Sequence, residues 1–261
     1  MREADDLSPQ SVGHMLKPSD PEWAHGVTRR NWSAPPAPLP FPGNGEVHLW
    51  RASLSPENDQ RWRGTLTSRE QERADRFHFP ADRRRFTVTR ALLRTLLGRY
   101  LQVSPESLRF DCNAFGKPSL PSSQNPRGIT FNVAHSGDCS LLAFAMATDL
   151  GVDVEHVELQ RDLALLARAV FSPSQYAAFL ALPDAMRTQM FFAAWTRKEA
   201  IVKALGGGLS ISPDGIELGE DGTQWTVRNI GLGDHYVAAI AVRSRNLDLR
   251  LWDWTNASGA V

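Results

Sequence analysis

The segment Gly151-Val152-Asp153-Val154-Glu155 is the most informative part of this chain. Its valines alternate with its carboxylates, and side chains two residues apart leave a β-strand on the same face. The segment therefore predicts a strand with one apolar face, suited to a core, and one face that carries two acidic groups. Taken alone, such a pattern is most often a strand whose polar face is solvated.

A second segment, Trp195-Thr196-Arg197-Lys198-Glu199-Ala200-Ile201-Val202-Lys203, predicts the end of a long helix. Glu199 and Lys203 lie one turn apart on one helix face, whereas Lys198 points elsewhere and Trp195 is expected to pack in the core. If this face meets the acidic face of the strand, three carboxylates and an ammonium converge. Such carboxylates repel one another unless a divalent cation lies among them, and Mg²⁺ prefers oxygen ligands that it shares with a phosphate. On its own, this helix segment is more often a charged surface.

Two further segments precede the acidic strand: Phe115-Gly116-Lys117-Pro118 and Phe131-Asn132-Val133-Ala134-His135-Ser136-Gly137-Asp138. Taken in order, the four segments resemble the signature motifs of the Sfp-type 4′-phosphopantetheinyl transferases. The resemblance runs from about residue 47 to about residue 240. One departure is visible, because Ala134 stands where that family usually has a serine that contacts the 3′-phosphate of coenzyme A.

The resemblance implies a reaction and its cofactor. A member of this family transfers the 4′-phosphopantetheine arm of coenzyme A to a serine hydroxyl of an apo acyl- or peptidyl-carrier protein and releases 3′,5′-ADP. The family depends on Mg²⁺, which Mn²⁺ can replace. For displacement at a pyrophosphate, a protein supplies mainly positioning and cationic stabilisation.

The resemblance also assigns roles to residues. Asp153, Glu155 and Glu199 would hold the metal ion, and Asp153, Glu199 and Lys203 would be the catalytic residues. Lys203 would neutralise the phosphate or protonate the leaving group. Glu199 would take the proton of the serine, either directly or through a metal-bound water, and both routes stay open.

Contacts to coenzyme A are expected from three parts of the chain. The segment 116–118 would border the adenine, His135 would contact the pyrophosphate, and Arg73 and Arg85 would meet the 3′-phosphate, since guanidinium groups suit phosphate geometry. Ser136 could replace the hydroxyl that Ala134 lacks. The full expected set is Arg73, Arg85, Gly116, Lys117, Pro118, His135 and Ser136.

Composition limits the other partners. The chain has 261 residues, 42% of them hydrophobic, and 29 basic against 29 acidic residues, so no bulk attraction to nucleic acid or to a membrane is expected. Residues 61–99 nevertheless hold 11 basic and only 4 acidic residues, a local excess of 7. A basic stretch opposite an acidic metal site suits a ligand with phosphates at both ends, although an Arg-rich solvated helix is the simpler interpretation.

The cysteines are Cys112 and Cys139 alone, without the spacing of a zinc site or a disulfide framework. The sequence contains no apolar run long enough to span a membrane and no signal-peptide pattern at its N-terminus. We therefore expect a cytoplasmic protein.

The order of elements predicts an α+β fold made of two similar halves. Residues 1–44 form a Pro-rich extension that is disordered or loosely docked, 45–148 the first half and 149–261 the second. In the first half the pattern predicts a strand at 47–50, a short helix with a capping box at Thr67 or Ser68 that reaches about Phe79, a longer helix after Pro80 that Asp82 can cap, and strands near 108–111, 130–133 and 140–146.

In the second half it predicts a strand at 152–155, a short helix capped by Ser172, a long helix that starts at 183–184 and ends at 206–208, and strands near 216–218, 225–227 and 236–242. The resemblance adds a pseudo-two-fold axis with coenzyme A in the cleft between the halves, and the doubled layout predicts a monomer.

Two alternatives stay open at this point. A Mg²⁺-dependent diphosphate hydrolase or nucleotidyltransferase could use the same carboxylates, but it would not explain the other segments. A coenzyme A-binding protein without activity is the second, and the intact acidic positions and Lys203 argue against it. Neither the carrier protein nor its pathway is evident from the sequence.

Overall fold

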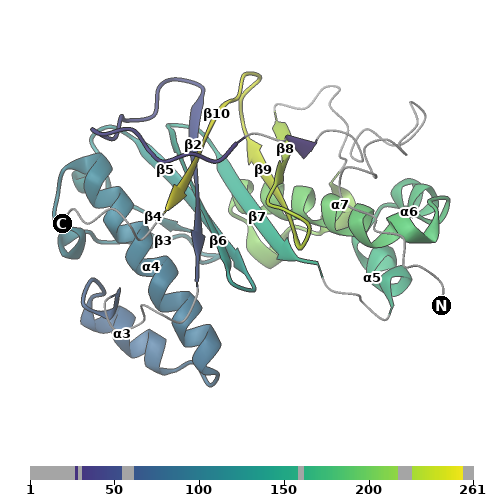
Figure 1. Ribbon diagram of the computed structural model, residues 1–261, viewed down its shortest axis with the longest axis horizontal. Coiled ribbons are helices and arrows are strands. Elements are labelled where there is room, and N and C mark those ends of the chain that lie inside the picture. Colours follow the sequence, from purple (N-terminus) through teal and green to yellow (C-terminus); the bar gives the residue numbers. More distant parts are fainter. Residues whose placement is uncertain (1–26, 29–30, 55–61, 158–161, 217–224, 255–261) are drawn as a thin grey trace.

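The computed structural model describes residues 27–28, 31–54, 62–157, 162–216 and 225–254. Two four-stranded sheets form its centre, and helices pack on the outer face of each sheet (Figure 1). One apolar cluster lies between each sheet and its helices, and a third apolar cluster lies between the two sheets. The predicted α+β class is therefore confirmed.

The first sheet contains β2 (Glu46–Ser53), β5 (Ile129–Ser136), β6 (Cys139–Met146) and β10 (Asp248–Trp254). Its order is β10-β2-β6-β5, with β10 parallel to β2 and the other pairs antiparallel. Both of its faces are buried, so apolar residues occupy consecutive positions: Leu142 packs toward the helices and Leu141 toward the second sheet.

The second sheet contains β1 (Val27–Thr28), β7 (Leu150–His156), β8 (Thr226–Gly231) and β9 (Tyr236–Val242). Its order is β1-β8-β9-β7, with β1 parallel to β8. Val152 and Val154 of β7 face the first sheet, as their alternation predicts. The acidic face of β7 is therefore turned toward the helices. A small two-stranded sheet, β3 (Asp111–Cys112) with β4 (Pro118–Ser119), completes the strands.

The two halves repeat one arrangement. The strands β2-β6-β5 and β7-β9-β8 are antiparallel triplets formed in the same chain order, and each half has a helix of 22 residues, α4 (Pro80–Leu101) or α7 (Asp184–Leu205). The predicted pair of similar halves is confirmed by this repetition. The fourth strands differ, because β10 joins β2 whereas β1 joins β8. Strand β10 thus joins the sheet of the first half although it follows β9 in the chain.

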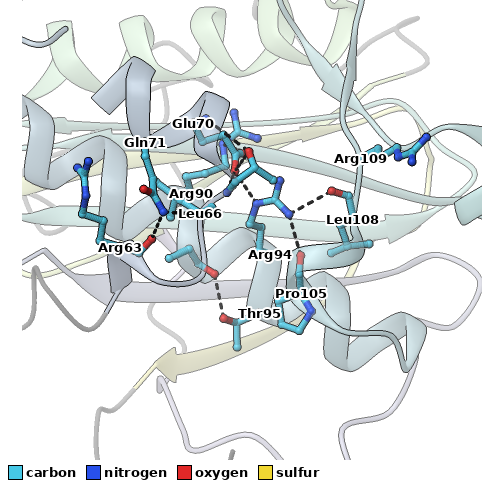
Figure 2. Close-up of polar contacts among 12 residues, drawn as sticks. Arg63, Leu66, Glu70, Gln71, Arg90, Arg94, Thr95, Pro105, Leu108 and Arg109 are labelled. Atoms are coloured by element: carbon cyan, nitrogen blue, oxygen red, sulfur yellow. Dashed lines mark hydrogen bonds and ion pairs between the residues drawn. The ribbon is translucent and has the colours of Figure 1, made fainter. Parts of the chain in front are cut away.

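Part of the basic stretch 61–99 has a structural role. Helix α3 (Ser68–Asp75) begins with the predicted capping box between Thr67 and Glu70. The Glu70 carboxylate then accepts a bond of 2.7 Å from Nε of the buried Arg94, which also donates to the carbonyls of Pro105 and Leu108 (Figure 2). These bonds attach α3 and the segment after α4 to α4 itself.

Helices α5 (Leu163–Val170), α6 (Pro173–Leu180) and α7 cover the second sheet. Ser172 caps α6 as predicted, and α7 ends at Gly206, whose φ of 72° favours glycine. Helix α5 was not predicted. Short 3₁₀ turns lie at Pro105–Ser107, Ser122–Gln124, Gly208–Ser210 and Pro213–Gly215.

Three boundary predictions are wrong. Helix α3 ends at Asp75 rather than near Phe79, and α4 begins at Pro80, so Asp82 lies inside the first turn instead of capping it. Proline favours this first position because its missing N–H has no partner there anyway. The strand expected near Leu108–Asp111 forms only at Asp111–Cys112. The strand expected at 216–218 falls largely outside the described residues.

The described residues of the N-terminal extension lie against the body. The indole of Trp32 donates to the carbonyl of Gly231, and Ser33 bridges to Trp252 of β10. The ring of Phe41 meets Tyr100 edge to face. Within the part of the chain that the structure describes, no helix is long and apolar enough to cross a membrane.

Candidate active site

The acidic strand lies directly under α7 because residue 151 is glycine. A Cβ atom at Gly151 would lie 2.0 Å from the carbonyl oxygen of Ala200 and 2.4 Å from the backbone nitrogen of Ala204. No larger side chain fits, so the backbone of the helix approaches the backbone of the strand. The faces that carry the predicted carboxylates and Lys203 are thereby brought together.

Asp153 and Lys203 form a close ion pair. The ammonium of Lys203 lies 2.6 Å from Oδ1 of Asp153, whose side chain is only 5% exposed. The other oxygen, Oδ2, is buried and has no hydrogen-bond partner. Burial raises the pKa of Asp153 to about 6 in spite of Lys203, and the charges of Glu155 and Glu199 add to that rise. One buried carboxylate oxygen is therefore available to a cation.

Glu155 is fixed by two donors. The indole Nε1 of Trp195 lies 3.1 Å from its Oε1, and the hydroxyl of Ser136 donates to its Oε2 over 3.1 Å. Ser136 in turn accepts a bond from the backbone N–H of His156. Glu155 thus connects the strand, the helix and the His135 segment.

Glu199 completes the acidic group. It is half-buried, and burial together with the charge of Glu155 raises its pKa, against the effect of Lys203. These electrostatic links join all three carboxylates and Lys203. Among the residues that the structure describes, however, no three His, Cys, Asp or Glu side chains are gathered closely enough to hold an ion as they stand.

His135 and Arg85 of the first half lie near this group. Desolvation by the surrounding protein, and then the charges of Lys203 and Arg85, lower the pKa of His135, although its side chain is exposed. Arg85 donates from Nε to the carbonyl of Gly137 over 2.8 Å and pairs with Asp82. The site therefore combines acidic groups of the second half with basic groups of the first.

The segment 116–118 lies at the C-terminal end of α7. The Lys117 ammonium donates to the carbonyls of Ala204 and Leu150, at 2.8 and 3.1 Å, and burial lowers its pKa. Asn113 of the same turn donates to the carbonyl of Gly206. Lys117 thus has a structural role as a helix cap, whatever else it contacts.

Arg73 is not brought to the carboxylates by any contact that the structure shows. It is exposed on α3, with its guanidinium 5.0 Å from the centre of the Phe86 ring. Ala134 is buried in the cluster between the sheets, 4% exposed. Its methyl group therefore takes part in core packing, where a hydroxyl would need a partner.

Sequence reasoning missed two residues that hold the site. Trp195 packs against the core as predicted, but its indole also positions Glu155. Asn132 is buried on β5 and accepts a bond of 2.9 Å from the backbone N–H of Val152 on β7, which connects the two sheets. The signal for Asn132 was a polar residue inside an apolar strand, since a buried amide needs partners. Lys198, as predicted, points away, and its ammonium donates to the carbonyls of Pro213 and Ile216.

Comparison with known proteins places this arrangement in a family. Residues 149–245 match the family model of the 4′-phosphopantetheinyl transferase superfamily, and residues 54–147 match the model of a 4′-phosphopantetheinyl transferase N-terminal domain. The chain is 37% identical to the 4′-phosphopantetheinyl transferase HetI of Nostoc sp., over 83% of this chain and 98% of that protein. The chain therefore belongs to the 4′-phosphopantetheinyl transferases, enzymes that use coenzyme A and transfer phosphopantetheine to carrier proteins.

More distant relatives carry the same activity in their names. The chain is 29% identical to the 4′-phosphopantetheinyl transferase Sfp of Bacillus subtilis, over 65% of this chain and 74% of that protein. It is 24% identical to the mouse L-aminoadipate-semialdehyde dehydrogenase-phosphopantetheinyl transferase, over 78% of this chain and 71% of that protein. The resemblance drawn from the four segments is confirmed, and the chain is an enzyme.

Proposed function

We propose that this chain moves the 4′-phosphopantetheine arm of coenzyme A to a serine hydroxyl of an apo acyl- or peptidyl-carrier protein in a Mg²⁺-dependent reaction. The observation that carries the metal assignment is Oδ2 of Asp153, a buried carboxylate oxygen without a partner beside two further carboxylates. Such an all-oxygen donor set fits Mg²⁺. Asp153, Glu155 and Glu199 are the proposed ligands, and the bound ion would stabilise negative charge on the pyrophosphate.

The residues of the chain itself account for binding and proton transfer. Lys203 and Arg85 both interact electrostatically with His135, and these basic side chains suit the phosphates of coenzyme A in a cleft between the halves. Lys203 is 31% exposed, so its ammonium can meet a phosphate oxygen while it neutralises Asp153. Gly116, Lys117 and Pro118 are the proposed border of the adenine. Arg73 is the proposed contact of the 3′-phosphate, where Ser136 would replace the hydroxyl that Ala134 lacks.

Glu199 is the proposed base. Its raised pKa makes it a better proton acceptor than an ordinary carboxylate, and it is half-buried. It would take the serine proton, directly or through water, as the hydroxyl attacks the β-phosphorus. Lys203 would stabilise the departing 3′,5′-ADP.

Both halves supply residues to the site, and both belong to one chain. We therefore propose that the protein acts as a monomer. A cytoplasmic location is part of the same proposal, because Cys112 and Cys139 are both free thiols, the state that a reducing compartment maintains.

Intact-mass measurement of apo carrier proteins tests the proposal. The protein is incubated with coenzyme A, with or without Mg²⁺, and with a panel of carriers from fatty-acid, polyketide and peptide synthesis. Addition of phosphopantetheine to the carrier serine is expected only with Mg²⁺, and loss of that addition in Glu199→Gln supports a role of Glu199 as base or as metal ligand. Hydrolysis of coenzyme A without addition to any carrier would instead establish a diphosphate hydrolase.

A further inference from the structure

The turn between β5 and β6 is held by both halves of the molecule. From the first half, Arg85 of α4 donates to the carbonyl of Gly137, and the backbone N–H of Leu54 donates to the carbonyl of Asp138 over 2.8 Å. From the second half, the hydroxyl of Tyr236 on β9 accepts a bond of 3.1 Å from the backbone N–H of Asp138. Two consecutive residues thus connect α4, the end of β2, and β9.

The fit of this turn against Tyr236 is close. A Cβ atom at Gly137 would lie 2.7 Å from the hydroxyl oxygen of Tyr236 and 3.5 Å from Cβ of His156, and the φ of Gly137 is +54°. The ring of His156 lies 5.0 Å from that of Tyr236, its partner in the β7–β9 register. Position 137 therefore needs glycine both for its conformation and for the approach of Tyr236.

The turn is continuous with residues of the candidate active site. Ser136, which precedes it, donates to Glu155 and accepts from the backbone of His156. Arg85, which donates to the carbonyl of Gly137 in the turn, interacts electrostatically with His135. A shift of the turn would therefore move contacts to both the acidic strand and the basic groups.

We propose that the hydroxyl of Tyr236 is a positioning residue for phosphopantetheine transfer. It fixes the 137–138 turn, and through the turn it keeps Arg85, His135 and Ser136 aligned with Glu155. The hydroxyl does not touch the reacting atoms. This inference rests on the proposed contacts of Arg85 and His135 with the phosphates of coenzyme A.

The variant Tyr236→Phe removes the hydroxyl and keeps the ring against His156. A neutral hydrogen bond of this kind corresponds to a change of roughly two- to tenfold in an equilibrium constant. We expect KM for coenzyme A to rise by about that factor, with kcat changed less than twofold, because the turn holds groups that bind donor and transition state alike. The matched control is Tyr176→Phe, since Tyr176 is also half-buried in the second half but packs in the α7 cluster away from the turn.

A double-mutant cycle separates positioning from a general structural effect. If Tyr236 acts through the turn, Tyr236→Phe should raise KM much less in an Arg85→Ala background than in the wild type. Gly137→Ala should also raise KM for coenzyme A, because its methyl group would displace the turn from Tyr236. An unchanged KM in Tyr236→Phe, or a lowered melting temperature with fully independent effects of the two substitutions, would overturn the inference.

The same design separates this inference from the proposed function. If the wild type modifies no carrier, the proposed function fails, and calorimetric titration with coenzyme A still compares Tyr236→Phe with Tyr176→Phe. If the wild type transfers normally and the two phenylalanine variants bind coenzyme A equally, only the role of Tyr236 fails.

Discussion

Trp195 and Glu155 are joined across the contact between α7 and β7, with indole Nε1 3.1 Å from Oε1 of the carboxylate. The Trp195 side chain thereby packs against the apolar cluster under α7 and also orients Glu155, a proposed metal ligand. A partner of this kind fixes the ligand before the ion arrives, which lowers the cost of binding. The tryptophan of the motif therefore has a role in the site as well as in the core.

Trp195→Phe should raise the Mg²⁺ concentration needed for half-maximal transfer by about tenfold, because Glu155 loses its indole donor. The melting temperature of the metal-free protein should change little, since an aromatic ring still packs there. Titration of activity with Mg²⁺ measures the effect. Trp225→Phe, in the same cluster, serves as the control and should leave the Mg²⁺ requirement unchanged. Equal Mg²⁺ requirements in both variants would contradict the role of the indole.

Asp153→Asn should abolish transfer and leave the metal-free protein as stable as the wild type, or more stable, above pH 6. The folded pKa of Asp153 is about 6 against an ordinary value of 3.8, so the folded state binds more protons between these values. The contribution of Asp153 to the stability of the wild type therefore falls as pH rises through this window, and the asparagine variant is spared that loss.

Thermal unfolding of metal-free Asp153→Asn at pH 4 and pH 7.5 tests this difference. The melting temperature of the variant should exceed that of the wild type only at the higher pH. Asp149→Asn is the control, because Asp149 is half-exposed in a surface pair with Arg243. Near-normal turnover of Asp153→Asn with Mg²⁺ would show that the metal assignment is wrong.

Gly151→Ala should impair folding and activity together. Its methyl group would meet the backbone of Ala200 and Ala204, which cannot move without displacing α7 from β7. Overpacking of this kind costs about 1–3 kcal/mol or more. Urea unfolding measures the loss, and Gly215→Ala is the control, because a Cβ there meets nothing within 4 Å. A stable, active Gly151→Ala protein would mean that the helix sits farther from the strand.

The two basic residues assigned to coenzyme A should behave differently. Arg73→Ala should weaken the binding of coenzyme A by roughly ten- to hundredfold, the equivalent of a charge-assisted contact. The binding of 3′-dephospho-coenzyme A should not change. Arg85→Ala should weaken the binding of both donors, because Arg85 also donates a hydrogen bond to the carbonyl of Gly137. Steady-state kinetics with both donors measures the four KM values. Equal losses on the two donors for Arg73→Ala would remove Arg73 from the 3′-phosphate site.

His48 should make the fold sensitive to acid. It is fully buried between Tyr100 and Trp252, and burial lowers its pKa to about 4 against the attraction of Glu46. The unfolded chain therefore binds the proton more tightly, and the stability present above pH 6.5 is lost as pH falls toward 4. The difference between the two pKa values corresponds to roughly 3 kcal/mol.

Urea unfolding from pH 7 to pH 4.5 measures this loss. In His48→Gln, the part of the slope of the unfolding free energy against pH that comes from His48 should disappear. Glutamine offers Tyr100 a polar partner but does not titrate. The slope should persist in His78→Gln, since His78 is exposed. Identical slopes in the wild type and His48→Gln would show that other groups dominate the acid response.

Local patterns were sufficient for much of the fold. The alternation in 151–155, the capping boxes at Thr67 and Ser172, and the glycine after α7 depend on neighbours in sequence, and the elements appear where these signals lie. Errors arose where two signals competed. Pro80 could end one helix or begin the next, and the local sequence does not distinguish the two.

The sequence by itself determined the class of enzyme, the two halves and which acidic and basic residues are candidates for the site, because motif order and side-chain chemistry are properties of the chain. Only the tertiary structure decided how these residues are held. The bonds from Trp195 to Glu155, from Asn132 to Val152 and from Tyr236 to Asp138 join residues 20 to 98 positions apart. Such contacts depend on how the two sheets pack, and no local pattern encodes that packing.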